Sequence, residues 1–304
     1  MSPTRYFAFG NVTVDDLVFA DGTTMWRVPG GNSIYAALGM ALWGERPEVV
    51  APIGPDYPIA KLKDRIELKR CRPISRTLRN WGLYEEDGTR HFVFRSNMRK
   101  WEEFSPNVAD LDEGPYAFCH LAPLPWALHL ELAAALRARA AHLISIDLDD
   151  RRLSEVPVSE LARLLSLIDL FMPSRQDVAQ IFPGKAPLDA LKALREIAPG
   201  CPVIVVKCGA AGAIAHERDS LDYLTSPTAV ASAVDETGAG DAFCGGALVG
   251  FSRNLTLREA LARAVVSASF AIEGVGSSGL VAASPAEAEG RLRKAADRIE
   301  ARRL

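Results

Sequence analysis

Short apolar runs alternate along the chain with longer segments in which apolar residues recur every three or four positions. The short runs are typical of buried strands and the longer segments of amphipathic helices. Strands and helices in alternation indicate a mostly parallel central sheet covered by helices on both faces, so the pattern predicts a doubly wound α/β fold. The predicted strands are Tyr6–Phe9, Glu48–Ile53, His142–Leu148, Leu167–Met172 and Pro202–Lys207, and the predicted helices lie within residues 32–44, 126–141 and 188–198.

Residues 76–96, RTLRNWGLYEEDGTRHFVFRS, break this rhythm. The Asp87-Gly88 pair lies between two arms with period-two spacing, as at Trp81 and Leu83, and Asp-Gly between such arms is a strong hairpin signal. The segment predicts an antiparallel appendage, which is either an ordinary edge hairpin or a lid over a site. Because no repeat, low-complexity tract or linker interrupts the chain, a single domain over residues 1–304 with a small β extension is the simplest account.

A glycine-rich segment, AVDETGAGDAFCGGALVGF, occupies residues 233–251. A strand is predicted over Thr228–Val234, and helical spacing follows Gly238–Asp241, so the glycines fall at a strand-to-helix turn. The first N–H groups of a helix lack intrahelical partners and, with the helix dipole, form an anion site that glycine leaves open. An aspartate in the first turn is also a common helix cap. The turn by itself therefore leaves both an anion site and an ordinary tight turn open.

Two further glycines, Gly245 and Gly246, lie inside the predicted helix, where each costs about 1 kcal/mol relative to alanine. They indicate close approach of a ligand or of another backbone, as in tight helix packing. Neither of two common phosphate-binding fingerprints is present. The segment around Gly184-Lys185 is not a Walker loop, because alanines stand where that motif has its first glycine and its hydroxyl residue. Gly238 and Gly240 are not followed by the third glycine that a dinucleotide site requires.

The composition is that of an ordinary globular chain, with 304 residues, 48% hydrophobic and 24% charged. The net charge of −3 offers no electrostatic basis for binding nucleic acid. No secretory leader and no run of about 18 apolar residues is apparent, so we expect a cytoplasmic protein without a membrane partner. The five cysteines form no C-x-x-C pair and are expected to be free thiols.

The segment DETGAGDAFCGG resembles the C-terminal signature of the ribokinase-like (PfkB) carbohydrate kinases. Weaker matches to the same family lie upstream in the family's order and extend the resemblance over nearly the whole chain. They are Gly10 with Asp15 in FGNVTVDDLV, Gly30-Gly31 in PGGNSIYAALG, Gly54 with Asp56 in PIGPDYP, and Gly209 with Gly212 in VVKCGAAGAIA.

The resemblance implies a ribokinase-like fold with a β-sheet lid, here formed by segments of about residues 12–30 and 76–100. In many members the lid also serves dimerisation, so a homodimer through the lid is expected. The implied reaction is transfer of the ATP γ-phosphoryl group to a hydroxyl, with Asp241 as the base and Gly238, Ala239 and Gly240 as the anion hole. The resemblance further implies that Mg²⁺ is a cofactor. Binding of K⁺ is a trait of the family, and carbonyls near Asp235 would bind this ion here. The ATP-binding residues that the resemblance implies are Ser174, Lys207, Gly209, Gly212, Gly238 and Gly240.

The chain departs from the family at two places. Tyr35 stands where the family has an asparagine of the di-glycine motif. Its ring could stack on a sugar or base or simply pack in its helix. Asn32 is nearby and could supply the amide instead. The family's N-x-x-E motif reads Ser174 to Asp177, and Asp177 is expected to be linked to Mg²⁺ through water, with a plain surface carboxylate as the alternative. The substrate-binding residues implied are Asp15, Gly30, Gly31, Asn32 and Tyr35.

The leading hypothesis is an ATP-dependent kinase of a small sugar or sugar-like molecule. A nucleoside kinase is the alternative within the kinases, and a sugar- or nucleotide-binding regulator without turnover is the alternative of another class. Arg90, Arg95 and Arg99 follow the hairpin turn. They would suit an acidic or phosphorylated substrate if they faced the site, although a solvated face is the more common role of such arginines.

Overall fold

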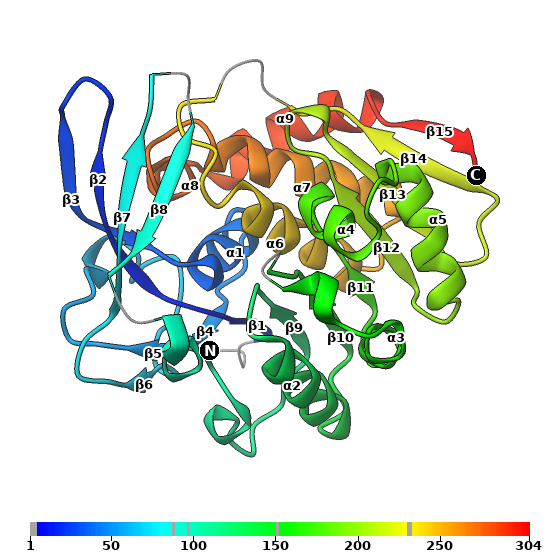
Figure 1. Cartoon of the computed structure of the whole chain (residues 1–304). Helices are drawn as coiled ribbons and strands as arrows, with labels where there is room; N and C mark the ends of the chain where they lie inside the picture. The colour runs from blue at the N-terminus through cyan, green and yellow to red at the C-terminus, as the bar shows by residue number, and fades with distance from the viewer. Residues whose placement is uncertain (1–4, 87–88, 96–97, 150–151, 230–232) are drawn as a thin grey trace.

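The structure, a computed structural model, describes residues 5–86, 89–95, 98–149, 152–229 and 233–304. Across the described body runs a nine-stranded sheet in the order β15-β14-β13-β12-β11-β10-β9-β1-β4 (Figure 1). The strands β4, β1, β9, β10, β11 and β12 are parallel to one another. Beyond β12, each of β13, β14 and β15 runs antiparallel to the strand before it. The strands of this sheet are β1 (Tyr6–Phe9), β4 (Glu48–Val50), β9 (Phe118–Leu121), β10 (Leu143–Ile146), β11 (Leu170–Phe171), β12 (Val203–Lys207), β13 (Ala213–Glu217), β14 (Asp222–Ser226) and β15 (Glu300–Arg303).

The central strands are apolar on both faces because helices cover both sides of the sheet. In β1, Tyr6 and Ala8 belong to one buried cluster and Phe7 and Phe9 to the other. The predicted strands at Tyr6–Phe9 and Pro202–Lys207 are thereby confirmed to within one residue.

The strand predicted over Thr228–Val234 is wrong in its described part. The last strand before the glycine-rich segment, β14, ends at Ser226. Pro227 follows, and proline has no N–H to donate to a sheet. Residues 230–232 lie outside the described part of the chain.

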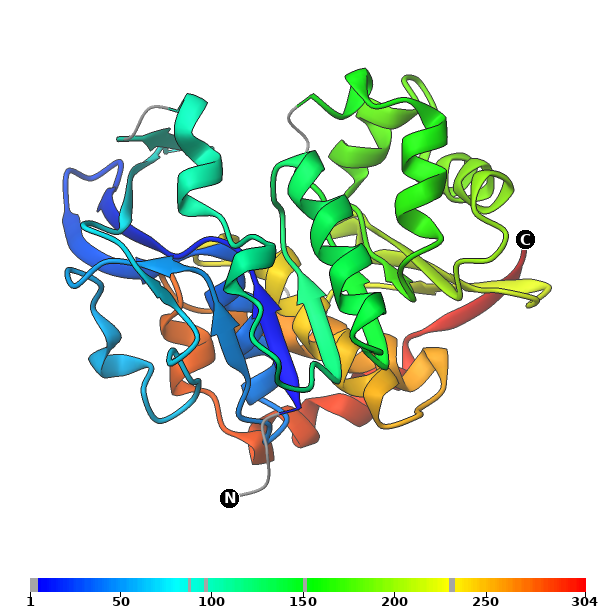
Figure 2. The same ribbon diagram turned by 90° about the horizontal axis from the view of Figure 1, so that it is seen from below.

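The helices form one layer on each face of the sheet (Figure 2). Helices α1, α6 and α7 pack together on one face, and α2, α3, α4 and α5 lie on the other. The α-helices are α1 (Asn32–Ala41), α2 (Trp126–Ala138), α3 (Val158–Leu165), α4 (Arg175–Ile181), α5 (Pro187–Ile197), α6 (Ala239–Ser252), α7 (Leu257–Ala271), α8 (Ser278–Ala282) and α9 (Pro285–Asp297). Short 3-10 helices are η1 (Ile59–Lys61), η2 (Met98–Phe104), η3 (Val108–Asp110), η4 (Leu153–Glu155) and η5 (Gly209–Ala211).

Helix α6 is clamped between α1 and α7, and its two internal glycines make this possible. A Cβ atom on Gly245 would lie 2.1 Å from the Ala36 carbonyl oxygen of α1. A Cβ atom on Gly246 would lie 2.4 Å from Ser267 Oγ of α7. Of the two explanations that the sequence left open for this pair, the structure shows close helix packing.

A second sheet stands apart from the body, at the left of Figure 1, and we call it the lid sheet. Its order is β3-β2-β7-β8, with two antiparallel pairs, β2–β3 and β7–β8, joined by parallel pairing of β2 with β7. The predicted hairpin of residues 76–96 is the β7–β8 pair, although its Asp87-Gly88 turn lies outside the described residues. The strands are β2 (Thr13–Val18), β3 (Thr24–Gly30), β7 (Leu78–Tyr84) and β8 (Arg90–Phe94), and a separate small pair is β5 (Pro52–Ile53) with β6 (Arg72–Pro73).

Candidate active site

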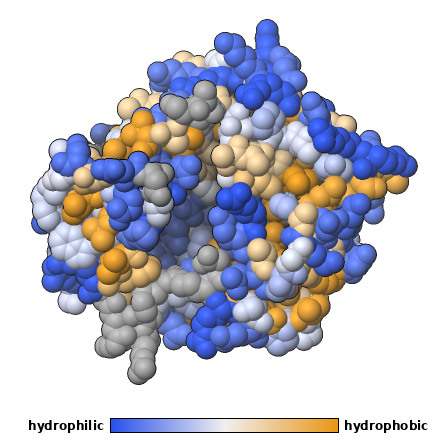
Figure 3. Space-filling view, turned by 45° about the horizontal axis from the view of Figure 1, so that its top comes forward, coloured by the Kyte–Doolittle hydropathy of each residue, from blue (hydrophilic) through white to orange (hydrophobic). Residues whose placement is uncertain are grey.

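The functional candidates gather at the carboxyl ends of the parallel strands, beside the lid sheet. Strand β1 has β4 on one side and β9 on the other, so the chain reverses its direction of winding there. Open α/β sheets bind ligands outside the strand ends at such a switch point. Figure 3 shows a hollow in the surface between the lid side and the body, with hydrophilic residues around it.

Two cavities of different size open in this region. The larger has a volume of about 700 Å³ and the smaller about 280 Å³. The larger lies over the ends of the body strands and the start of α6, and the smaller lies under the lid sheet. Asp241 lines both cavities, as do Pro123 and Asp149. The carboxylate that the sequence singled out therefore lies where the two cavities meet.

The helix start predicted at Gly238–Asp241 is present. Gly238 precedes α6 with a φ of 75°, a left-handed conformation that favours glycine. A Cβ atom there would lie 2.1 Å from Tyr35 Cδ1, so the Tyr35 ring packs directly against this residue. Gly240 and Ala239 face the larger cavity. The start of α6 thus lies at the junction of the two cavities, where the first N–H groups of a helix favour an anion, although the Ala239 N–H also donates to the Glu236 carbonyl oxygen at 3.3 Å.

Asp241 is half-buried and has a strongly shifted pKa. Burial raises the pKa of its carboxyl from 3.8 to about 8, and repulsion from Asp147 adds to the shift, while the Lys207 ammonium opposes it. A carboxylate of this kind is a stronger base near neutral pH than an ordinary aspartate, which makes Asp241 suitable for accepting a proton from a hydroxyl.

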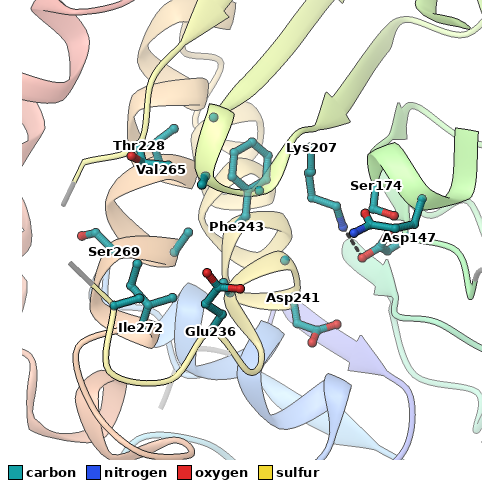
Figure 4. A pocket seen from close by; sticks show the side chains of 18 of the residues that line it. Asp147, Ser174, Lys207, Thr228, Glu236, Asp241, Phe243, Val265, Ser269 and Ile272 are labelled. Atoms are coloured by element: carbon teal, nitrogen blue, oxygen red, sulfur yellow. Dashed lines mark hydrogen bonds and ion pairs between the residues drawn. The ribbon is translucent and has the colours of Figure 1, made fainter. Parts of the chain in front are cut away.

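Lys207, at the end of β12, is ion-paired with Asp147, which directly follows β10 (Figure 4). Both side chains line the larger cavity. Burial by itself lowers the pKa of Lys207, but the Asp147 carboxylate outweighs it and holds the pKa above the ordinary value. Burial raises the pKa of Asp147, and the Lys207 ammonium resists this. A permanently charged ammonium at the cavity wall, close to Gly240, is a suitable ligand for phosphate oxygens.

Ser174 and Asp177 form the capping box of helix α4. Ser174 Oγ accepts from the Asp177 N–H at 3.1 Å, and Asp177 Oδ2 accepts from the Ser174 N–H at 2.5 Å. Both residues line the larger cavity. Burial and then repulsion from Asp147 raise the pKa of Asp177 to about 7. Asp177 is therefore buried rather than a plain surface carboxylate.

The turn at Gly209 and Gly212 also lines the larger cavity. Both residues have positive φ, 60° and 88°. A Cβ atom on Gly212 would lie 1.8 Å from the Ser226 carbonyl oxygen, so only glycine fits where these strands come together.

The smaller cavity has a polar end built around Asp15 of β2. Asn80 of β7 donates to Asp15 Oδ1 at 2.9 Å, and burial raises the pKa of Asp15 to about 7. A Cβ atom on Gly30 would lie 2.0 Å from Asp15 Oδ2, which explains the first glycine of the pair. Gly31 has a φ of 114°, and a Cβ atom on this residue would lie 2.3 Å from the Asn11 carbonyl oxygen.

Asn32 lines the smaller cavity, but its amide is occupied by the protein. Its Oδ1 accepts from the N–H groups of Asn11 and Ser33, each at 2.7 Å, and its Nδ2 donates to the Pro123 carbonyl at 2.8 Å. Tyr35 is buried in its helix and also lines this cavity.

Sequence reasoning missed several residues of the smaller cavity, among them Asn80, Phe92, Phe94 and Trp101. The alternation along β7 and β8 held a signal, because Asn80 pairs with Phe94 and shares its face, while Trp81 pairs with Val93 on the other face. Trp101 gave no local signal. The full set of missed lining residues is Asn11, Thr13, Leu78, Asn80, Phe92, Phe94, Trp101, Pro123, Asp149 and Thr237.

Two of the three arginines after the hairpin turn are engaged in ion pairs within the protein. Arg95 pairs with Asp16 at 2.7 Å and stacks over the Trp81 ring. Arg90 pairs with Asp235 and Glu236. The side chain of Arg99 lies outside the described part. Neither described arginine lines a cavity, so the geometry gives no support to an acidic substrate.

The described residues contain no cluster of three or more histidine, cysteine, aspartate or glutamate side chains suited to hold a metal ion by themselves. A hard cation that is bound largely by substrate phosphates and water fits the donors present, because the carboxylates that line the larger cavity include Asp177 and Asp241. No helix in the described part of the chain is long and apolar enough to cross a membrane.

The model of the pfkB family of carbohydrate kinases matches residues 10–283, which includes every candidate residue above. The chain belongs to this family. Its members are kinases that transfer a phosphoryl group to a hydroxyl acceptor, and this is the class of activity of the present enzyme.

Individual relatives agree with this assignment. A cytidine kinase of Thermococcus kodakarensis is 26% identical over 257 residues, which cover 82% of this chain and 89% of the relative. The solved nucleoside kinase of Methanocaldococcus jannaschii superposes with a TM-score of 0.74 at 17% identity, covering 96% of this chain and 99% of that one. A ribokinase II candidate from E. coli, solved with ATP and Mg²⁺, gives a TM-score of 0.76 at 18% identity, with coverage of 96% and 100%. The two structural likenesses establish the ribokinase-like fold.

Proposed function

We propose that this kinase uses ATP to phosphorylate a hydroxyl of a nucleoside, with Asp241 as the base. The observation that carries the proposal is the position of Asp241 in the walls of both cavities. A hydroxyl held under the lid sheet and a terminal phosphate held over the body would meet at this carboxylate. The large cavity, at about 700 Å³, lies within the usual range of about 300–1,000 Å³ for a ligand of nucleotide size.

In the proposed reaction each group has a separate task. Asp241 orients the hydroxyl and accepts its proton as the phosphoryl group departs from the nucleotide. The N–H groups of Gly238, Ala239 and Gly240 stabilise negative charge on the transferred group, and Lys207 adds positive charge beside them. When bound, Mg²⁺ would neutralise phosphate charge, and Asp177 is placed to hold it through water.

A nucleoside suits the smaller cavity because that cavity has two unlike parts. Asp15 and Asn80 provide a polar end for the hydroxyls of a sugar ring. Aromatic rings provide a face for a flat base. They are Tyr35, Phe92, Phe94 and Trp101.

The relative that is a cytidine kinase, which aligns with most of this chain, adds support to a nucleoside. A small sugar, the leading hypothesis from the sequence, becomes the second candidate here, because the polar end formed by Asp15 and Asn80 would bind its hydroxyls equally well.

The oxygen atoms near Asp235, where the resemblance led us to expect K⁺, already accept hydrogen bonds within the protein. Asp235 Oδ1 accepts from the Thr237 N–H at 2.9 Å and from Arg90 at 3.4 Å, and its Oδ2 accepts from the Gly276 N–H at 2.8 Å. The nearby Ile272 carbonyl already accepts from the N–H groups of Val234 and Asp235. We therefore propose that turnover does not depend on K⁺.

A coupled assay of ADP release tests the proposed function. It uses cytidine, uridine, adenosine, ribose and fructose as acceptors, in buffers of K⁺ or of tetramethylammonium, with Asp241→Asn as the inactive control. Fastest turnover with a nucleoside, equal in both buffers, is expected. Turnover with the sugars alone would replace the nucleoside by the second candidate. Ligand binding without ADP release from any acceptor would favour the regulator, whose sequence support is the altered Ser174–Asp177 motif.

We also propose a homodimer that forms through the outer face of the lid sheet. Trp26 is 56% exposed there, with Val93 and Leu83 also exposed. Contiguous exposed apolar residues are typical of an interaction surface. Light scattering at the mass of a single chain would refute this. We propose that the reaction takes place in the cytoplasm, and the five free cysteines support this.

A further inference from the structure

Arg90 links the lid sheet to the loop that leads into α6. From β8, its Nη1 donates to Thr237 Oγ1 at 2.9 Å and to Asp235 Oδ1 at 3.4 Å, and its Nη2 donates to Glu236 Oε2 at 3.3 Å. In Figure 1 the segment before α6 runs alongside β8. One guanidinium thus contacts three consecutive residues, and the next residue is Gly238, the first of the proposed anion hole.

The contact with Asp235 is the most important of the three. The Asp235 side chain is 1% exposed, whereas that of Glu236 is 62% exposed. An exposed ion pair contributes little, but a buried carboxylate requires a cation or several hydrogen bonds. Without Arg90, Asp235 would keep its two backbone donors, Thr237 and Gly276, and the neighbouring Tyr84 hydroxyl, but its charge would lack a cationic partner within the described residues.

The same sheet that carries Arg90 also carries the polar end of the smaller cavity. Arg90 pairs with Tyr84 across β7 and β8, and β7 contributes Asn80, which holds Asp15 of β2. A displacement of the lid sheet therefore moves the substrate contacts and the guanidinium together. The loop 235–237 is the segment through which that displacement reaches the N-terminus of α6.

We propose that Arg90 is a positioning residue that couples the seating of the lid sheet over the smaller cavity to the alignment of the anion hole at Gly238–Gly240. It touches neither cavity and acts through Asp235 and Thr237. Its loss should lower kcat by about 10–100-fold, because small misplacements of groups around a reacting centre have effects of that size. The KM for ATP should change little, because most of the larger cavity lies on the body.

Arg95 provides a matched control. It follows the same strand, but its Nη1 donates to Asp16 Oδ2 at 2.7 Å on the outer face of the lid sheet. Arg79 also donates to Asp16, so the carboxylate keeps a cationic partner when Arg95 is replaced. The variants Arg90→Gln and Arg95→Gln thus remove the same charge from the same sheet, and only the former should disturb the loop before α6.

The test combines hydrogen exchange with kinetics on Arg90→Gln, Arg90→Lys and Arg95→Gln. In the ligand-free protein, amides of residues 236–241 should exchange at least about tenfold faster in Arg90→Gln than in the wild type or Arg95→Gln, with exchange in β12 unchanged. Arg90→Lys should restore part of kcat, because an ammonium can neutralise Asp235 but cannot contact all three acceptors.

The kinetic arm rests on the proposed function, since it uses the best acceptor from the substrate panel, and the exchange arm does not. Unchanged exchange of residues 236–241 in Arg90→Gln would overturn the role of Arg90, whatever the substrate. A kcat equal to that of Arg95→Gln would overturn it as well. Failure of the wild type to phosphorylate any acceptor would instead refute the proposed function, and the exchange result would still decide whether Arg90 holds the loop.

Discussion

Replacing Asp241 with asparagine should stabilise the protein at alkaline pH while it removes turnover. Burial and repulsion from Asp147 raise the pKa of Asp241 from 3.8 to about 8. Between these two values the unfolded chain has released the proton that the folded protein still holds. The free energy of unfolding therefore falls by about 1.4 kcal/mol for each pH unit in this window. The loss is absent below the lower pKa and complete above the higher one.

The structure sets the size of the effect. From pH 5 to pH 8 the window spans about three pH units, so the linkage limits the destabilisation by Asp241 to about 4 kcal/mol. The carboxylate is half-buried and faces two cavities open to solvent, which screens its charge. We therefore expect about half of this limit, or about 2 kcal/mol. Asparagine has nearly the same shape and no charge, so the variant should gain this amount relative to the wild type as the pH rises from 5 to 8.

Urea unfolding at pH 5 and pH 8 measures the gain directly. Asp64→Asn is the control, because the Asp64 side chain is exposed and its replacement removes the same charge. In parallel, kcat of Asp241→Asn should fall by about 10²–10⁴-fold, the usual contribution of a general base. A gain that is the same at both pH values, or that Asp64→Asn reproduces, would refute the reasoning about burial. Near-normal kcat would remove Asp241 from its proposed role.

Two further predictions concern the substrate pocket and the helix layer. Burial raises the pKa of Asp15 to about 7, so its carboxylate becomes protonated as the pH falls through that value. The KM for the acceptor should therefore rise about tenfold for each pH unit below about 7. A profile of KM against pH measures this rise, and a flat profile would contradict the prediction. Gly245→Ala should lower the free energy of unfolding by about 2 kcal/mol or more, because its Cβ atom would clash with the Ala36 carbonyl oxygen. Gly290→Ala is the control, because the added Cβ atom in α9 meets open space. This variant should raise the free energy of unfolding by about 1 kcal/mol, measured by thermal unfolding like the first. If both variants lost the same free energy of unfolding, the clash would be excluded as the cause.

Most of the body could be predicted from the sequence because its strands are continuous apolar runs. Strand β12 begins one residue after its predicted start and ends where predicted, at Lys207, and β1 has its predicted bounds. The local pattern failed in the described part of Thr228–Val234, where β-branched and small residues suggested a strand but β14 ends at Ser226, before Pro227. The helix start at Gly238–Asp241 was predictable because a glycine with positive φ and an acidic first turn are local properties.

The smaller cavity was not predictable in the same way. Asp15 and Asn80 meet only because β2 and β7, 65 positions apart, lie side by side in the lid sheet. The orientation of Arg90 likewise depends on the loop 235–237, which is 145 residues away in the chain. Nothing near either residue in the sequence specifies these partners.

The sequence by itself therefore determined the α/β layers, the helix start at the glycine-rich turn and the kinase family, since each depends on a periodicity or a motif within a short segment. Only the tertiary structure decided that Gly245 and Gly246 serve helix packing, that Ser174 and Asp177 cap a helix at the cavity wall, and that Asp241 borders two cavities. These features depend on contacts between segments far apart in the chain. Such contacts are selected by the packing of whole elements, which no local pattern encodes.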